Sequence, residues 1–87
     1  MIDTLKLIDA IKKLENELRN SGKEATANFF LKAIDTIINE TNNKKLKIFL
    51  ELLCSSGSVS QYANFSFHED ELFDKIFEEA QKIIVKI

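Results

Sequence analysis

The chain carries one cysteine and one histidine, two residue types that often form a nucleophile and its base. Such a pair needs its side chains in contact and a third group to orient the histidine. Cys54 falls in an apolar segment, where burial raises the pKa of a thiol and makes it inert. His68 lies beyond a long loop, at the start of a helix. The sequence therefore predicts no catalytic pair, and a single cysteine excludes an internal disulfide bond.

Carboxylates offer two further kinds of chemistry, acid–base catalysis and metal binding. Asp70 and Asp74 share a helix face, but such pairs are routine on solvated helix surfaces. His68, Asp70 and Glu71 supply three ligands, whereas structural zinc takes four, usually from cysteine or histidine. The two glycines stand far apart, so no phosphate-binding loop is present. We predict a protein that is not an enzyme and that holds neither metal nor cofactor.

Three lysines gather before the third apolar segment, at Lys44, Lys45 and Lys47. A basic helix start is more often a solvated edge than a phosphate-binding surface. The helix that follows is also too apolar to serve as a recognition helix in the major groove of DNA. We therefore predict that nucleic acid is not a partner.

The longest interruption of the helical pattern is residues 55–67, with the sequence SSGSVSQYANFSF. Loops of this length within a compact domain are uncommon and are often functional. Tyr62 lies in the middle of the loop, close to Asn64, and tyrosine is enriched at binding hot spots. An equally good interpretation is that Tyr62 covers the core with its hydroxyl group in solvent.

An acid-rich segment follows the loop. Residues 68–79 hold six carboxylates and one lysine, a charge that disfavours nucleic acid and suits a basic protein surface. The alternative is that the acids only stabilise the first turns of a helix through its dipole. On the first interpretation the candidate partner-binding residues are Tyr62, Asn64, Asp70, Glu71, Asp74 and Glu78.

Four segments with apolar residues at helical spacing must position these side chains. They predict helices over about 4–20, 24–40, 44–55 and 68–86. Gly22 favours the left-handed conformation that ends the first helix, and Ser66 with Glu69 matches a capping box before the fourth. A start at His68, with Phe67 packed on Leu72, is nearly as good.

The 87 residues are enough for one domain, spanning 1–87, and proline is absent. We predict an all-α fold, a small four-helix bundle with a long loop before the last helix. The third helix is apolar on most sides, so we expect it to be the most buried. The predicted core contains Leu14, Leu18, Phe30, Ile34, Phe49, Leu53, Phe73, Ile76 and Phe77.

The C-terminal half carries a pattern of residue types known from small bacterial proteins. Residues 57–64 (GSVSQYAN) are followed by 71–73 (ELF) and 77–80 (FEEA) in a closing helix. This pattern resembles the small all-α immunity proteins of contact-dependent and polymorphic toxin systems. The resemblance implies an inhibitor that binds one cognate toxin domain, plausibly a nuclease, and does no chemistry itself.

Two functional hypotheses follow. The first is a cytoplasmic immunity protein that uses the loop and the acidic helix start to bind a basic toxin domain. The second is a structural or regulatory helical module, a homodimer in which a second copy covers the apolar excess on the second and third helices. No stretch has the form of a signal peptide or reaches membrane-spanning length, so we expect no membrane contact.

Overall fold

A computed structural model describes residues 4–54 and 66–87, which form four helices and no strand. The helices are α1 (Leu5–Asn20), α2 (Glu24–Asn39), α3 (Asn43–Cys54) and α4 (Phe67–Ile84). Their ends lie within one or two residues of the predicted ones. The all-α class and the four-helix bundle predicted from the sequence are confirmed.

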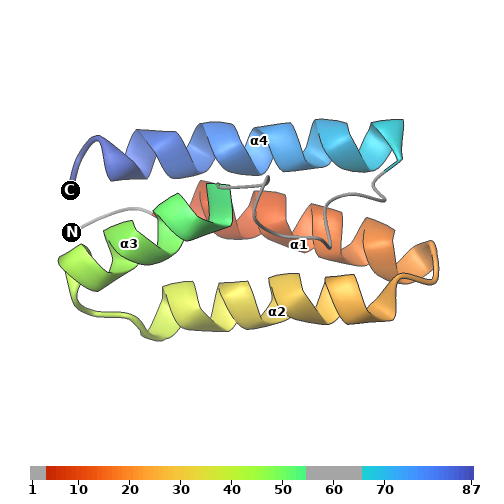
Figure 1. Cartoon of the computed structure of the whole chain (residues 1–87), viewed down its shortest axis with the longest axis horizontal. Helices are drawn as coiled ribbons and strands as arrows, with labels where there is room; N and C mark the ends of the chain where they lie inside the picture. Colours follow the sequence, from red (N-terminus) through yellow and green to blue (C-terminus); the bar gives the residue numbers. More distant parts are fainter. Residues whose placement is uncertain (1–3, 55–65) are drawn as a thin grey trace.

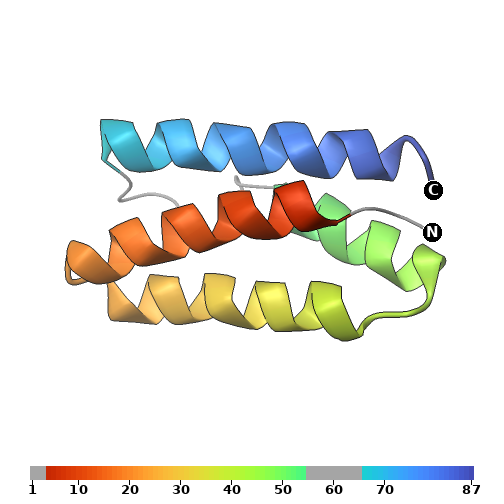
Figure 2. The same ribbon diagram turned by 180° about the vertical axis from the view of Figure 1, so that it is seen from behind.

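Helix α1 is the centre of the bundle. It packs against α2 on one side and α4 on the other, and α3 packs against α4. Figures 1 and 2 show α1 between α2 and α4, with the end of α4 toward the same end of the bundle as the start of α1. The bundle measures 35 × 21 × 18 Å. Helix α1 therefore separates α2 from α4, and these two helices form opposite sides of the bundle.

Short polar segments fix the helix ends. Gly22 has φ of 80°, and two hydrogen bonds close the last turn of α1: Lys23 N to Leu18 O at 2.9 Å and Gly22 N to Arg19 O at 3.2 Å. This pattern is a Schellman motif, which confirms the predicted role of Gly22. The Asn42 side chain caps α3, because its Oδ1 accepts hydrogen bonds from the backbone N–H groups at 44 and 45.

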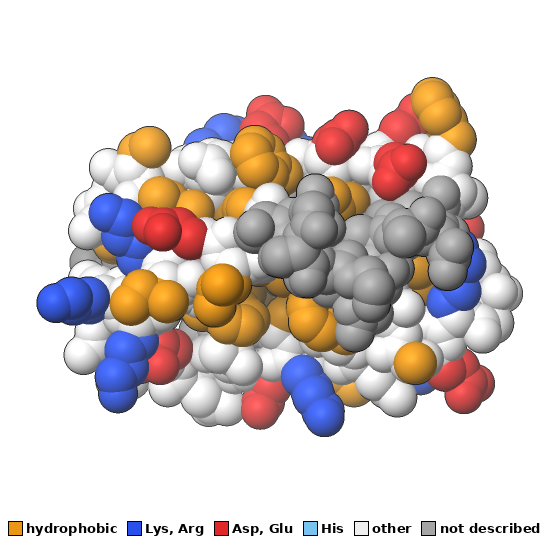
Figure 3. All heavy atoms as spheres, in the orientation of Figure 1, with side chains coloured by type: hydrophobic (Ala, Val, Ile, Leu, Met, Phe, Trp, Pro, Cys, Tyr) orange, Lys and Arg blue, Asp and Glu red, His pale blue; other side chains and the backbone are white. Residues whose placement is uncertain are grey.

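The prediction that the third helix is the most buried is wrong. Helix α3 buries only the stripe formed by Leu46, Leu50 and Leu53, whereas Ile48 and Leu52 are 54% and 62% exposed. Its 12 residues pack mainly against one neighbour, α4, and one neighbour covers only one face of a helix. In Figure 3, hydrophobic side chains are visible on the surface in the region of α3.

The core is built mainly by α1, α2 and α4. Seven of the nine predicted core residues are buried, and two depart from the prediction. Phe49 is only partly buried against the core, and Phe77 is 43% exposed. Phe30 takes the central place, fully buried, with its ring centroid 5.1 Å from that of Phe29 and 6.4 Å from that of Phe73.

Cys54, expected to be buried, is half-buried at the end of α3. Burial raises the pKa of its thiol, and a smaller opposing effect comes from a hydrogen bond with Gln81 of α4. We expect the native protein to react with a thiol reagent at pH 7 more slowly than the urea-unfolded chain does. The Cys54→Ala variant should keep its helical circular dichroism. Equal reaction rates for native and unfolded protein would contradict the effect of burial.

Within the described residues, no helix combines the length and the apolar composition that crossing a membrane requires.

Candidate functional site

The outward side of α4 combines acidic and aromatic side chains. Phe67 is 81% exposed and Phe77 is 43% exposed, and the four acids between and beside them are exposed as well. Spacings of three, four and seven residues place all of them on one face of the helix. Figure 3 shows acidic and hydrophobic side chains together along the edge formed by α4, at the top of the view. This α4 face consists of Phe67, Asp70, Glu71, Asp74, Phe77 and Glu78.

Two of its four carboxylates have no ionic partner among the described residues, and the other two have only distant, exposed ones. Among the described residues, Asp70 and Asp74 form no ion pair. Glu78 lies 3.9 Å from the ammonium groups of both Lys75 and Lys82, at exposed positions where ion pairs contribute little. Glu71 Oε2 lies 3.9 Å from Nδ1 of the exposed His68. The α4 face therefore keeps a negative field that attracts a basic surface.

A buried ion pair holds the start of α4 against the turn between α1 and α2. The predicted capping box is present: Ser66 Oγ accepts from Glu69 N at 3.2 Å, and Ser66 N donates to Glu69 Oε1 at 2.8 Å. Lys23 Nζ donates to the same Oε1 at 2.6 Å, and the Glu69 side chain is only 1% exposed. The contact fixes the position of the first turn, where the α4 face begins.

Glu69 has the capping role that the sequence predicted, and unlike its acidic neighbours on α4 it is buried. Burial alone would raise the pKa of its carboxyl group. Hydrogen bonds from Lys23, Ser66 and Ser21, with the positive charge of Lys23, outweigh burial and lower the pKa below its ordinary value. Glu69 is thus an ionised structural group in the bundle and not part of a partner surface.

The predicted site residues divide into two groups. Asp70, Glu71, Asp74 and Glu78 are brought together on the α4 face, as the helical spacing predicted. Tyr62 and Asn64 lie outside the described residues, so their place beside this face stays a prediction.

The sequence interpretation missed the two aromatic members of the α4 face. Phe77 was assigned to the core, and Phe67 was considered as a packing partner of Leu72. The buried side of α4 includes the charged residues Glu69 and Glu79, so the apolar residues alone do not determine which side of the helix is buried. Phe77 lies at the edge of this side and is partly exposed. The capping box was the available signal, because it places Phe67 at the first helical position, outside the core stripe.

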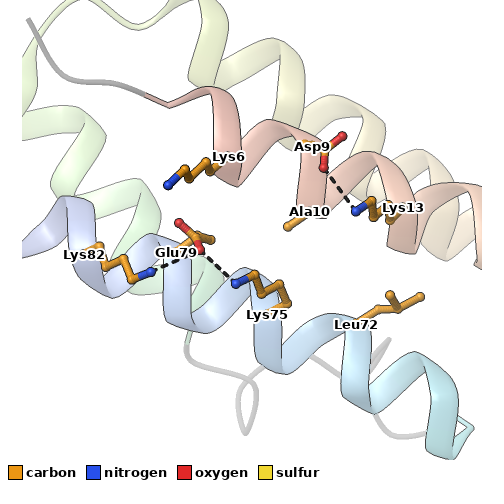
Figure 4. A pocket seen from close by; sticks show the side chains of 8 residues that line it. All are labelled: Lys6, Asp9, Ala10, Lys13, Leu72, Lys75, Glu79 and Lys82. Carbon is orange, nitrogen blue, oxygen red and sulfur yellow. Dashed lines mark hydrogen bonds and ion pairs between the residues drawn. The ribbon is translucent and has the colours of Figure 1, made fainter.

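A groove lies between α1 and α4, with a volume of about 260 Å³. Its lining includes Lys6, Lys13, Lys75 and Lys82 (Figure 4). Glu79, 6% exposed, binds Lys75 at 3.1 Å and Lys82 at 3.3 Å. The hydrogen bond from Lys75 is the main reason that the pKa of Glu79 is lowered, and the same bond raises the pKa of Lys75. Lys13 and Asp9 pair at 3.3 Å.

The charges of this groove are thus largely paired within the protein. Among the charged residues that line the groove, Lys6 alone forms no ion pair with a described residue, and it extends from α1 toward α4 in Figure 4. The side chains that line the groove form a network of ion pairs beside the α4 face, and we assign no ligand to the groove.

Within residues 4–54 and 66–87, no three histidine, cysteine, aspartate or glutamate side chains are grouped so that they could hold a metal ion. No family model, curated protein or solved structure matches this chain. The resemblance to immunity proteins therefore remains a prediction.

Proposed function

We propose that this protein is a binding domain that recognises a basic surface of another protein through the α4 face. The observation that carries the proposal is the pair of exposed rings, Phe67 and Phe77, among four exposed carboxylates on one side of a helix. Exposed aromatic side chains raise the free energy of the isolated protein in water, and a partner that covers them recovers that energy.

The two kinds of side chain contribute differently to binding. Aromatic residues near the centre of an interface dominate affinity and slow dissociation. The surrounding carboxylates raise the association rate with a basic partner and make that rate sensitive to salt. The α4 face has both, with its aromatic residues about three helical turns apart.

The partner that we propose is a bacterial toxin domain, plausibly a nuclease, which the protein neutralises as an immunity protein. The resemblance that suggests this role includes residues 71–73 and 77–80, and both stretches lie in α4. A nuclease substrate cleft is basic because it binds phosphate, so an acidic helix with aromatic anchors fits it. Occupying the cleft blocks the toxin without any chemistry in the inhibitor.

The experiment begins with the neighbouring genes. An adjacent gene for a large secreted protein supplies the candidate toxin, and its C-terminal domain is expressed in bacteria with and without the present protein. We expect the domain to stop growth and co-expression to restore it. A toxic neighbouring domain that co-expression leaves fully toxic would contradict the proposal.

Variants then test the α4 face. Phe77→Ala, and separately Tyr62→Ala, should each weaken binding by about 2 kcal/mol or more if its ring is a hot spot. The double charge reversal Asp74→Lys with Glu78→Lys should slow association most strongly at low salt. Surface plasmon resonance with the toxin domain measures both rates. The matched control is Glu51→Lys, at an exposed acid on α3, which should leave both rates unchanged.

A further inference from the structure

Helix α2 exposes two large apolar side chains that its own bundle does not cover. Leu31 is 48% exposed and Ile38 is 61% exposed, with the buried Ile34 between them. Their spacing of three and four residues makes one stripe along the helix. The stripe lies in a shallow groove of about 350 Å³, which Lys32 and Asp35 also line. Contiguous exposed apolar surface rimmed by polar groups is typical of a contact site.

The charges beside this stripe are opposite in sign, and neither is paired with an opposite charge among the described residues. Lys32 and Asp35 fall on the same side of the stripe, because each helical residue is rotated by about 100° from the last. Neither forms an ion pair with any residue of the described ranges. Asp35 Oδ1 accepts a hydrogen bond from the Asn39 amide at 3.0 Å, which leaves its charge in place.

We propose that the occupant of this groove is a second copy of the same chain, with the two α2 helices packed antiparallel about a two-fold axis. In such an isologous contact, one side of the stripe meets the same side of the other copy. Leu31 of each copy then faces Ile38 of the other, and Lys32 lies within about 3 Å of Asp35 along the helix axis, an offset that the long lysine side chain can span. The charge pattern is therefore complementary to itself, which favours a second copy over an unrelated partner.

The contact surface is small. Helix α2 has 16 residues and is about 24 Å long, so two such helices bury less area than a standard protein interface. The dimer should therefore be weak and depend on concentration. Because α1 separates α2 from α4 (Figures 1 and 2), the dimer leaves both α4 faces free, and this proposal stands or fails independently of the proposed function.

Sedimentation equilibrium of the full chain, from roughly 10 µM to 1 mM, tests the proposal in a range suited to weak association. We expect a rise from monomer toward dimer mass. Ile38→Lys should weaken the dimer at least about tenfold. Leu52→Lys on α3 is the matched control, because Leu52 is 62% exposed and lies on another helix, and it should leave dimerisation unchanged.

A charge exchange tests the register. Lys32→Asp alone puts an aspartate at position 32 of each copy against Asp35 of the other copy. This repulsion occurs twice in the dimer and should weaken it about tenfold or more. Adding Asp35→Lys restores opposite charges and should return the dimer to near wild-type strength. A monomer at every concentration would overturn the proposal. A dimer that is not weakened by Ile38→Lys would contradict the α2 contact. A dimer that Asp35→Lys does not restore in the Lys32→Asp variant would contradict it as well. Circular dichroism confirms that each variant is folded.

Discussion

Replacing Phe30 with alanine is expected to lower the free energy of unfolding by about 3–5 kcal/mol. Phe30 is fully buried on α2, and it makes edge-on ring contacts with Phe29 and with Phe73 of α4. The substitution removes this contact area and leaves a cavity between helices. A chain of 87 residues has a total stability of about 4–13 kcal/mol, so the loss is a large share of it.

Urea unfolding followed by circular dichroism measures this effect. Phe77→Ala is the control, because the ring of Phe77 is 43% exposed and its removal should cost only about 1 kcal/mol. Equal losses for the two variants would contradict the assignment of Phe30 to the core and of Phe77 to the surface.

The second large effect concerns the ion pair between Lys23 and Glu69. Lys23→Met removes the ammonium group and keeps much of the aliphatic stem, so a carboxylate that is 1% exposed loses its charged partner. We expect a loss of roughly 3 kcal/mol at pH 7, at the low end for a buried pair because the Lys23 side chain is 31% exposed. The control is Lys13→Met, which breaks a surface pair to Asp9 and should cost less than about 0.5 kcal/mol.

The pH dependence of this loss has a defined sign. The pKa of Glu69 is lowered in the folded protein, so its ion pair stabilises the fold fully above the unfolded-state pKa of about 4.3. That contribution disappears as the pH falls further, through the lower pKa of the folded state. The difference between wild type and Lys23→Met should therefore be largest near pH 7 and shrink in acid. A difference that is constant or larger in acid would contradict the ion pair.

The helices could be predicted because their signals are local. Apolar spacing, Gly22 and the Ser66 capping box each act within a few residues, and all three are present as predicted. The burial of α3 could not be predicted in this way, because composition does not say how many neighbours a helix has. Ile48 and Leu52 are as apolar as any core residue, yet they lie on the side of α3 away from its stripe.

Only the part of the candidate site that depends on local spacing could be predicted from the sequence. Glu71, Asp74 and Glu78 share a face because of their helical spacing alone, and this spacing can be read from the sequence. Helical spacing and the capping box also place Glu69 off that face, but its buried charge is paired with Lys23, which is 46 residues away in the chain. No local pattern reports such a contact, so the rotation of α4 and the exposure of Phe77 required the three-dimensional structure.

We propose the α4 face as the surface where a partner protein binds. The most direct test of this proposal is a titration of isotope-labelled protein with the unlabelled toxin domain, followed by the NMR signals of its backbone amides. We predict that the largest changes fall between residues 67 and 78, with little change in α3. Changes confined to the Lys44–Lys47 edge or to the α1 surface, with residues 67–78 unaffected, would contradict the claim.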